Sequence, residues 1–155
     1  MFRLCKRDAN MRHRRPRMID SSFTLGMSRG QVVPALNLEK IQLLLMLYDK
    51  AIRCMDEAVR LIEVGDVIGK NEQLIRAQDI VLQLSDALEK NASDTVARSI
   101  STNLERLYLY IYRRLIHGNL SIDRDAVLEA RRLMETLYSA WTQAASGEPD
   151  LALSS

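Results

Sequence analysis

The feature of this chain that most constrains its fold is a long run of apolar residues separated by alternating steps of three and four. These residues are Leu38, Ile41, Leu45, Tyr48, Ile52, Met55, Val59 and Ile62. A seven-residue repeat of this length predicts an amphipathic helix that needs other helices to cover its apolar side. We predict a helix over 38–64, with Asn37 as its N-cap and Gly65 as the residue that ends it.

A second helix is expected to begin after Asp66, which is a candidate N-cap. Its apolar stripe consists of Leu74, Ala77, Val81, Leu84 and Leu88. The polar residues 91–94 follow this stripe, so the helix should fade near Lys90.

The third stripe raises a choice between helix and strand, because residues 107–112 are rich in Leu, Ile and Tyr, which is typical of strands. Over the wider region, apolar residues recur at steps of three and four, and no turn residue interrupts them. These residues are Val96, Ile100, Leu104, Leu107, Ile111 and Leu115. The length of the pattern favours a helix over about 94–117, which Gly118 should stop.

A fourth helix should begin after Ser121 or Asp123, either of which is a candidate N-cap, and should end past Ala145. Its stripe consists of Val127, Ala130, Met134, Leu137, Trp141 and Ala144. Four helices of similar length with short connections predict an all-α fold, an antiparallel up-down four-helix bundle.

Composition agrees with one helical domain. Only nine of the 155 residues are Gly or Pro, and 47% are hydrophobic, so the chain has few helix breakers and enough apolar residues for a core. No apolar run reaches the roughly 18–20 residues that a membrane span needs. We expect a flexible basic N-terminal arm over 1–35, the bundle over 36–146 and a flexible C-terminal tail over 147–155.

Charge is divided unevenly along the chain. Residues 1–30 hold eight Lys or Arg and two Asp, a net charge of +6, whereas residues 31–155 hold 14 basic and 18 acidic residues, a net charge of −4. A basic arm can bind nucleic acid or an anionic membrane, or it can be a solvated tail. Phe2 and Phe23 are its only aromatic residues, so it offers little for stacking on bases, and we favour the solvated tail.

The sequence shows no arrangement typical of an enzyme, a cofactor site or a metal site. No Glu stands three residues before either His13 or His117, no Cys and His cluster has zinc spacing, and no glycine-rich phosphate loop is present. His117 precedes a glycine at an expected helix end, where a structural role is typical. The two cysteines suit free thiols in a reducing compartment. By elimination, the chain is expected to be a binding protein.

Several apolar residues lie outside the four stripes. They are Leu43, Leu44, Leu47, Ile80, Leu82, Tyr108, Leu109, Tyr110, Tyr112 and Ile116. They predict either a broader core or a groove that accepts an amphipathic helix from another chain. Two other functions remain open from the residues alone: a self-associating helical scaffold with an apolar dimer face, and a nucleic-acid-binding bundle that uses the basic arm.

Short motifs spread over residues 36–145 resemble the flagellin export chaperones of the FliS family. They are Leu45-Met46-Leu47-Tyr48-Asp49, Ala51-Ile52-Arg53, Gly65-Asp66, Lys70-Asn71, Ala77-Gln78-Asp79-Ile80, Asn103-Leu104, Leu107-Tyr108, Tyr110, Arg113-Arg114-Leu115, Asn119-Leu120 and Ala140-Trp141. The sequence departs from the family pattern at Glu39-Lys40, Lys50 and His117-Gly118, and in its basic arm.

The resemblance implies a cytoplasmic chaperone that binds the C-terminal helical segment of newly made flagellin. Such a chaperone prevents premature polymerisation and delivers flagellin to the flagellar type III export apparatus. It implies no catalysis and no cofactor. We also expect no metal, no membrane insertion and a monomer or weak homodimer, and we do not favour a nucleic-acid partner. The expected flagellin-binding residues combine a family match with an apolar surface or a polar tip. They are Tyr48, Ala51, Ile52, Ala77, Ile80, Leu84, Asn103, Leu107, Tyr108 and Tyr110.

Overall fold

The computed structural model describes residues 38–147, and these form four helices. They are α3 (Leu38–Val64), α4 (Val67–Asp86), α5 (Thr95–Ser121) and α6 (Arg124–Ser146). The described residues contain no strand, so the predicted all-α fold is confirmed, and residues 107–112 are helical. The predicted arm, the N-cap at Asn37 and residues 148–155 of the predicted tail lie outside the described residues.

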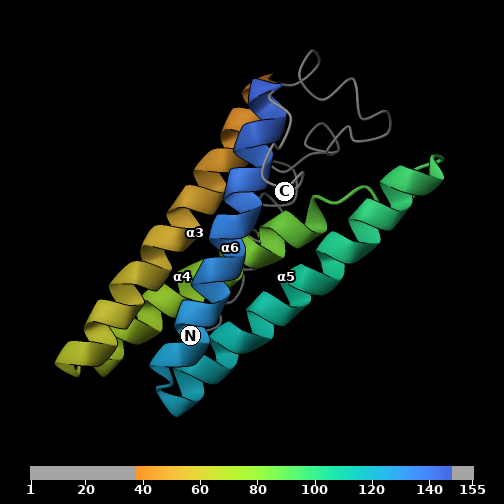
Figure 1. Cartoon of the computed structure of the whole chain (residues 1–155). Coiled ribbons are helices and arrows are strands. Elements are labelled where there is room, and N and C mark those ends of the chain that lie inside the picture. The colour runs from red at the N-terminus through yellow and green to blue at the C-terminus, as the bar shows by residue number, and fades with distance from the viewer. Residues whose placement is uncertain (1–37, 148–155) are drawn as a thin grey trace, which may run out of the picture.

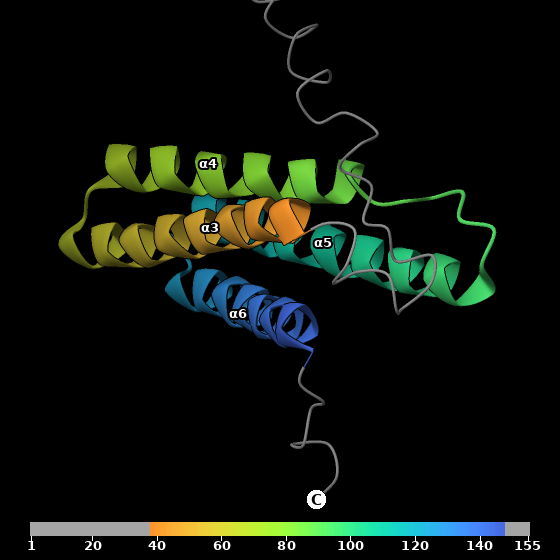
Figure 2. The ribbon, with the colours of Figure 1, turned by 90° about the horizontal axis from the view of Figure 1, so that it is seen from above.

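The helices form a ring in chain order (Figures 1 and 2). α3 packs against α4 and α6, and α5 packs against the same two neighbours. Successive helices run antiparallel, so the α3–α4 and α5–α6 turns lie together at one end of the bundle (Figure 1). The predicted up-down four-helix bundle is therefore confirmed.

The helix boundaries follow the predicted local signals at most positions. Gly65, after α3, has a φ of 77°, and the side chain of Asp66 accepts a hydrogen bond from the Gly69 backbone N–H at 2.9 Å. Asp123 caps α6 by accepting from the next backbone amides, and Gly147 ends that helix in the left-handed conformation. α4 ends at Asp86 rather than near Lys90.

The prediction that Gly118 stops the third helix is wrong. Gly118 is buried within α5, which continues to Ser121. A Cβ at residue 118 would lie 2.7 Å from Cγ2 of Val127 on α6, which is closer than real side chains pack. The glycine therefore permits a close approach of two helices and does not break one. The helix ends instead at Ile122, whose φ is 51°.

The predicted stripe of α4 is buried along its whole length, whereas on α3 and α5 the core lies on a slightly different side than the predicted stripes. Leu44, Ile80 and Tyr108, predicted to be surplus, are buried, whereas Leu38 and Val96, predicted to be in the stripes, are 55% and 64% exposed. On α3 the centre of the buried side contains the small residues Ala51, Cys54 and Ala58, which lie outside the stripe of large apolar side chains. The buried residues of α3 are Ile41, Leu44, Tyr48, Ala51, Cys54, Met55, Ala58, Val59 and Leu61.

Candidate partner-binding surface

Six of the ten predicted binding residues lie in the core. Each of them is at most 5% exposed; they are Tyr48, Ala51, Ala77, Ile80, Leu84 and Tyr108. Residues so placed offer no surface to a partner while the bundle is closed. Substitutions at these positions are therefore expected to act first on stability.

The two buried tyrosines are held by hydrogen bonds between their side chains. The hydroxyl groups of Tyr48 and Tyr108 bond to each other, and the Trp141 indole Nε1–H donates to the Tyr48 hydroxyl oxygen at 3.1 Å. Burial raises the pKa of Tyr48 to about 12 and that of Tyr108 still further, so both stay neutral. This network joins α3, α5 and α6 and satisfies three polar groups that would otherwise be buried without partners.

The other four predicted residues reach the surface, and three of them share one side of α5. Asn103, Leu107 and Tyr110 are spaced by four and three residues, which places them on one helix face. The Tyr110 hydroxyl donates to Glu129 of α6, so this face is the one turned toward α6. Asn103 and Tyr110 are exposed, and Leu107 is half-buried.

The half of the α5–α6 seam next to the turn is closed. Arg114 forms an ion pair with Glu129 at 2.6 Å, and His117 Nε2 lies 3.3 Å from Asp123. Hydrogen bonds from the backbone amides of Ala126 and Asp125 help to hold the pKa of Asp123 below its usual value. Together with the close packing at Gly118, these contacts seal this half.

The other half of the same seam is open. The antiparallel register set by the Arg114–Glu129 pair brings the N-terminal half of α5 opposite the C-terminal half of α6. There Ala140 and Ala144 are exposed, whereas Ala126 and Ala130, nearer the turn, are fully buried. The N-terminal half of α5 diverges from α6 in Figure 1.

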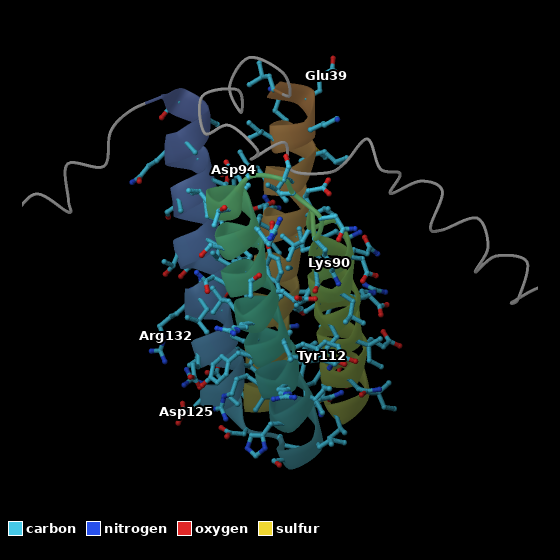
Figure 3. All side chains as sticks on the ribbon, turned by 90° about the vertical axis from the view of Figure 1, so that its right-hand side faces the viewer. Glu39, Lys90, Asp94, Tyr112, Asp125 and Arg132 are labelled. Carbon is cyan, nitrogen blue, oxygen red and sulfur yellow. The ribbon has the colours of Figure 1, made fainter. Side chains whose placement is uncertain are left out.

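We call this region the open seam. All of its residues are half-buried or exposed, and all but Asn103 are apolar. They are Ile100, Asn103, Leu104 and Leu107 on α5, and Leu133, Leu137, Ala140 and Ala144 on α6. Figure 3 shows the molecule with α5 in front, α6 on one side of it and α4 on the other. Arg132 is labelled on α6, and Tyr112 is labelled on the side of α5 that is turned toward α4. The α6 contribution was not predicted as a site, although Leu133, Leu137, Ala140 and Ala144 repeat at steps of four, three and four.

Ile52, the tenth predicted residue, belongs to a different place. It lines an open hollow of about 600 Å³ between α3 and α6. The rest of that lining is mostly polar and consists of Asp49, Arg132, Glu135, Thr136, Tyr138 and Ser139. The predicted residues thus do not converge on one surface: Asn103 and Leu107 line the open seam, Tyr110 extends the same face of α5, and Ile52 lies in the hollow.

Metal-binding clusters and membrane-spanning helices are absent from residues 38–147. No group of three or more His, Cys, Asp or Glu side chains is placed there to hold a metal ion. Within the same range, no helix is long and apolar enough to cross a membrane.

The fold and the surface define a class of protein: an antiparallel four-helix bundle with an apolar seam between two helices, which residues 38–147 cover only in part. The family description that matches this chain is "Flagellar protein FliS", over residues 31–148. The chain belongs to the FliS family of flagellar export chaperones, which is not a family of enzymes, and the predicted resemblance is confirmed.

Curated relatives carry the same family name. A flagellar secretion chaperone FliS from Bacillus subtilis is 33% identical over 107 residues, covering 69% of this chain and 76% of the relative. Another from Salmonella typhimurium is 35% identical over 102 residues, covering 66% and 73%. One from Escherichia coli is 31% identical over 103 residues, with the same coverage of 66% and 73%.

Proposed function

We propose that this chain binds the C-terminal helical segment of newly made flagellin in the bacterial cytoplasm, prevents its premature polymerisation and delivers it to the flagellar type III export apparatus. The observation that carries the proposal is the open seam, together with the family membership. A chaperone of this kind needs an apolar surface long enough for a helix and no catalytic group.

The open seam has the dimensions and chemistry that a helical client needs. It follows α5 from Ile100 to Leu107, about two helical turns at 1.5 Å per residue, and α6 from Leu133 to Ala144. Small residues at Ala140 and Ala144 leave space for side chains of a docked helix. Apolar area removed from water contributes about 25 cal/mol per Å², which must exceed the entropy lost when the client becomes ordered.

Calorimetric titration of the full chain with the C-terminal segment of a flagellin from the same genome tests this proposal. We expect one-to-one binding with a negative heat-capacity change, because apolar surface is buried. Circular dichroism of the mixture should show more helix than the sum of the separate components. Absence of both signals would contradict the flagellin assignment.

A matched pair of substitutions locates the site. Asn103 faces the open seam and Thr102, one residue earlier, faces away from α6; both are exposed. Asn103→Arg should weaken client binding at least tenfold by filling the seam, and Thr102→Arg should leave binding unchanged. Ala140→Arg should match Asn103→Arg from the α6 side.

A third variant tests the second candidate surface. Ser139→Arg places a long side chain in the hollow that contains Ile52. If Ser139→Arg weakens binding and Asn103→Arg does not, the client occupies the α3–α6 hollow and not the open seam. Light scattering across concentrations separates both results from self-association of the chain.

A further inference from the structure

The outer side of α4 carries an apolar stripe that faces away from the core. Ile68, Ile75 and Leu82 are 76%, 45% and 42% exposed and are spaced by seven residues, which keeps them on one helix face. The inner side of the same helix is fully used, because Leu74, Ala77 and Val81 are completely buried. α4 is therefore apolar on two sides, and residues 38–147 cover only one of them.

Acidic residues accompany this stripe at each turn. Glu72, Asp79 and Asp86 are exposed and follow the apolar residues by four positions, so they lie beside them. None of the three carboxylates lies within ion-pair distance of a basic side chain among residues 38–147, although other surface acids such as Asp56, Glu57 and Glu63 do. We call Ile68, Glu72, Ile75, Asp79, Leu82 and Asp86 the outer stripe of α4.

The stripe lies on the edge of α4 nearer to α5. Asn119 of α5 donates to Asn71 of α4 at 2.7 Å, and Lys90 after α4 pairs with Glu105 of α5 at 2.8 Å. These two contacts fix the register of the α4–α5 seam and place Leu109, which is 47% exposed, next to the stripe. The stripe is thus on a different side of α5 from the open seam.

We propose that residues 1–30 of this same chain dock on the outer stripe of α4. These residues carry a net charge of +6, which complements the unpaired carboxylates on the stripe. Apolar residues are interspersed among their basic residues, and these can cover the exposed apolar side chains of α4; they include Leu4, Met18, Phe23, Leu25 and Met27.

The geometry of the bundle makes this docking accessible. α3 and α4 are antiparallel neighbours, so the chain enters α3 at Leu38 near the end of the bundle where α4 finishes at Asp86. The outer stripe is about 27 Å long, since it spans 18 steps of 1.5 Å. The 37 residues before Leu38 span up to about 120 Å when extended, so the segment reaches every residue of the stripe.

A single labelled cysteine in the full chain tests the proposal. Cys5 is the cysteine of the basic segment, and Cys54 is buried, with a pKa raised by burial, so a nitroxide reagent should react with Cys5. We expect the nitroxide to broaden amide signals of α4 between Ile68 and Asp86 more than those of α6. A Cys54→Ala variant with the same pattern confirms that Cys5 carries the label.

Two charge variants distinguish specific docking from general attraction. Glu72→Gln, Asp79→Asn and Asp86→Asn together remove the acids of the stripe. The control, Asp49→Asn, Glu57→Gln and Glu135→Gln, removes three half-buried acids of α3 and α6, each of which is ion-paired within its own helix. We expect the first triple variant, or 0.5 M salt, to abolish the broadening on α4 and the control to retain most of it.

The apolar part of the proposal has its own matched pair. Ile75→Ser with Leu82→Ser should also reduce the broadening, whereas Leu43→Ser with Met46→Ser, at exposed positions of α3, should not. Broadening that is equal on all helices, or centred on the open seam, would overturn the proposal. Broadening caused only by the label on a second molecule, and not by the label on the same chain, would also overturn it. Client binding is not used as a readout, so failure here leaves the proposed flagellin site untouched.

Discussion

The two halves of the α5–α6 seam are built from the same pair of helices and differ in how they are closed. Next to the turn, Gly118 packs directly on Val127, and Arg114 pairs with Glu129. In the other half, Leu107 and Leu137 are only half-buried and Ala140 is exposed. The half next to the turn combines a glycine at the helix contact with an ion pair at its edge, and this combination does not recur in the described residues of the other half.

The largest expected difference between the halves comes from removing one leucine side chain in each. Leu115 is fully buried, so Leu115→Ala should lower the free energy of unfolding by about 2–5 kcal/mol. Leu107→Ala, in the open seam, should lower it by only about 1 kcal/mol, because that side chain is already partly in water. Urea unfolding followed by circular dichroism measures both, and equal losses would contradict the division into a closed and an open half.

A second substitution tests the close approach itself. Gly118→Ala places a methyl group 2.7 Å from Cγ2 of Val127, and we expect a loss of about 1–3 kcal/mol in unfolding free energy. The gain in helix propensity of alanine over glycine, about 1 kcal/mol, reduces this loss.

The double variant with Val127→Ala provides the control. If the loss at Gly118 comes from the clash, the double variant should be more stable than the sum of the two single effects predicts. Strict additivity of the two effects would mean that the glycine is not required by this contact.

A smaller effect, of opposite sign, is expected where α5 ends. Ile122 has a φ of 51°, a conformation that costs a residue with a Cβ about 1–2 kcal/mol. Ile122→Gly should therefore raise the free energy of unfolding. The gain should be only up to about 1 kcal/mol, because glycine loses more conformational entropy on folding than isoleucine and this offsets part of the relieved strain. Leu120→Gly, which lies within the helix, should lower it, and thermal melts of the two variants should shift in opposite directions.

The smallest expected effect is a pH dependence at the edge of the closed half. The pKa of Asp123 is lowered in the folded chain, chiefly by a hydrogen bond from the Ala126 backbone amide. A lowered pKa means that this stabilisation is present above about pH 4, the ordinary range of Asp, and is lost as the pH falls through the folded value. Asp123→Asn should therefore flatten the fall in urea midpoint below pH 4, and an unchanged profile would contradict this contribution.

The local signals of the sequence located the helices well. Residues 38–64 were predicted as a helix and form one, and Asp66 and Asp123 act as N-caps. These features depend on side chains within a few residues of each other, so spacing alone is enough to predict them. Gly118 shows the boundary of that approach, because its role depends on Val127 of another helix.

The candidate site was predicted less well, for a related reason. The sequence identified Asn103 and Leu107, which line the open seam, but also Tyr48 and Tyr108, which are buried and bonded to each other. An apolar or aromatic residue in a helix has the same local pattern whether it faces the core or a partner. The family resemblance marked both kinds equally, since its motifs include residues of the core as well as residues of the surface.

The sequence by itself determined that this protein is a helical bundle of the FliS family, with a positively charged segment ahead of an acidic body. Periodicity, capping residues and motif spacing are properties of neighbouring positions, so they can be recognised from the sequence alone. Only the tertiary structure decided which apolar side α3 and α5 bury, where α5 and α6 meet and where they separate. Those choices depend on how four helices fill a common volume, and no single helix contains that information.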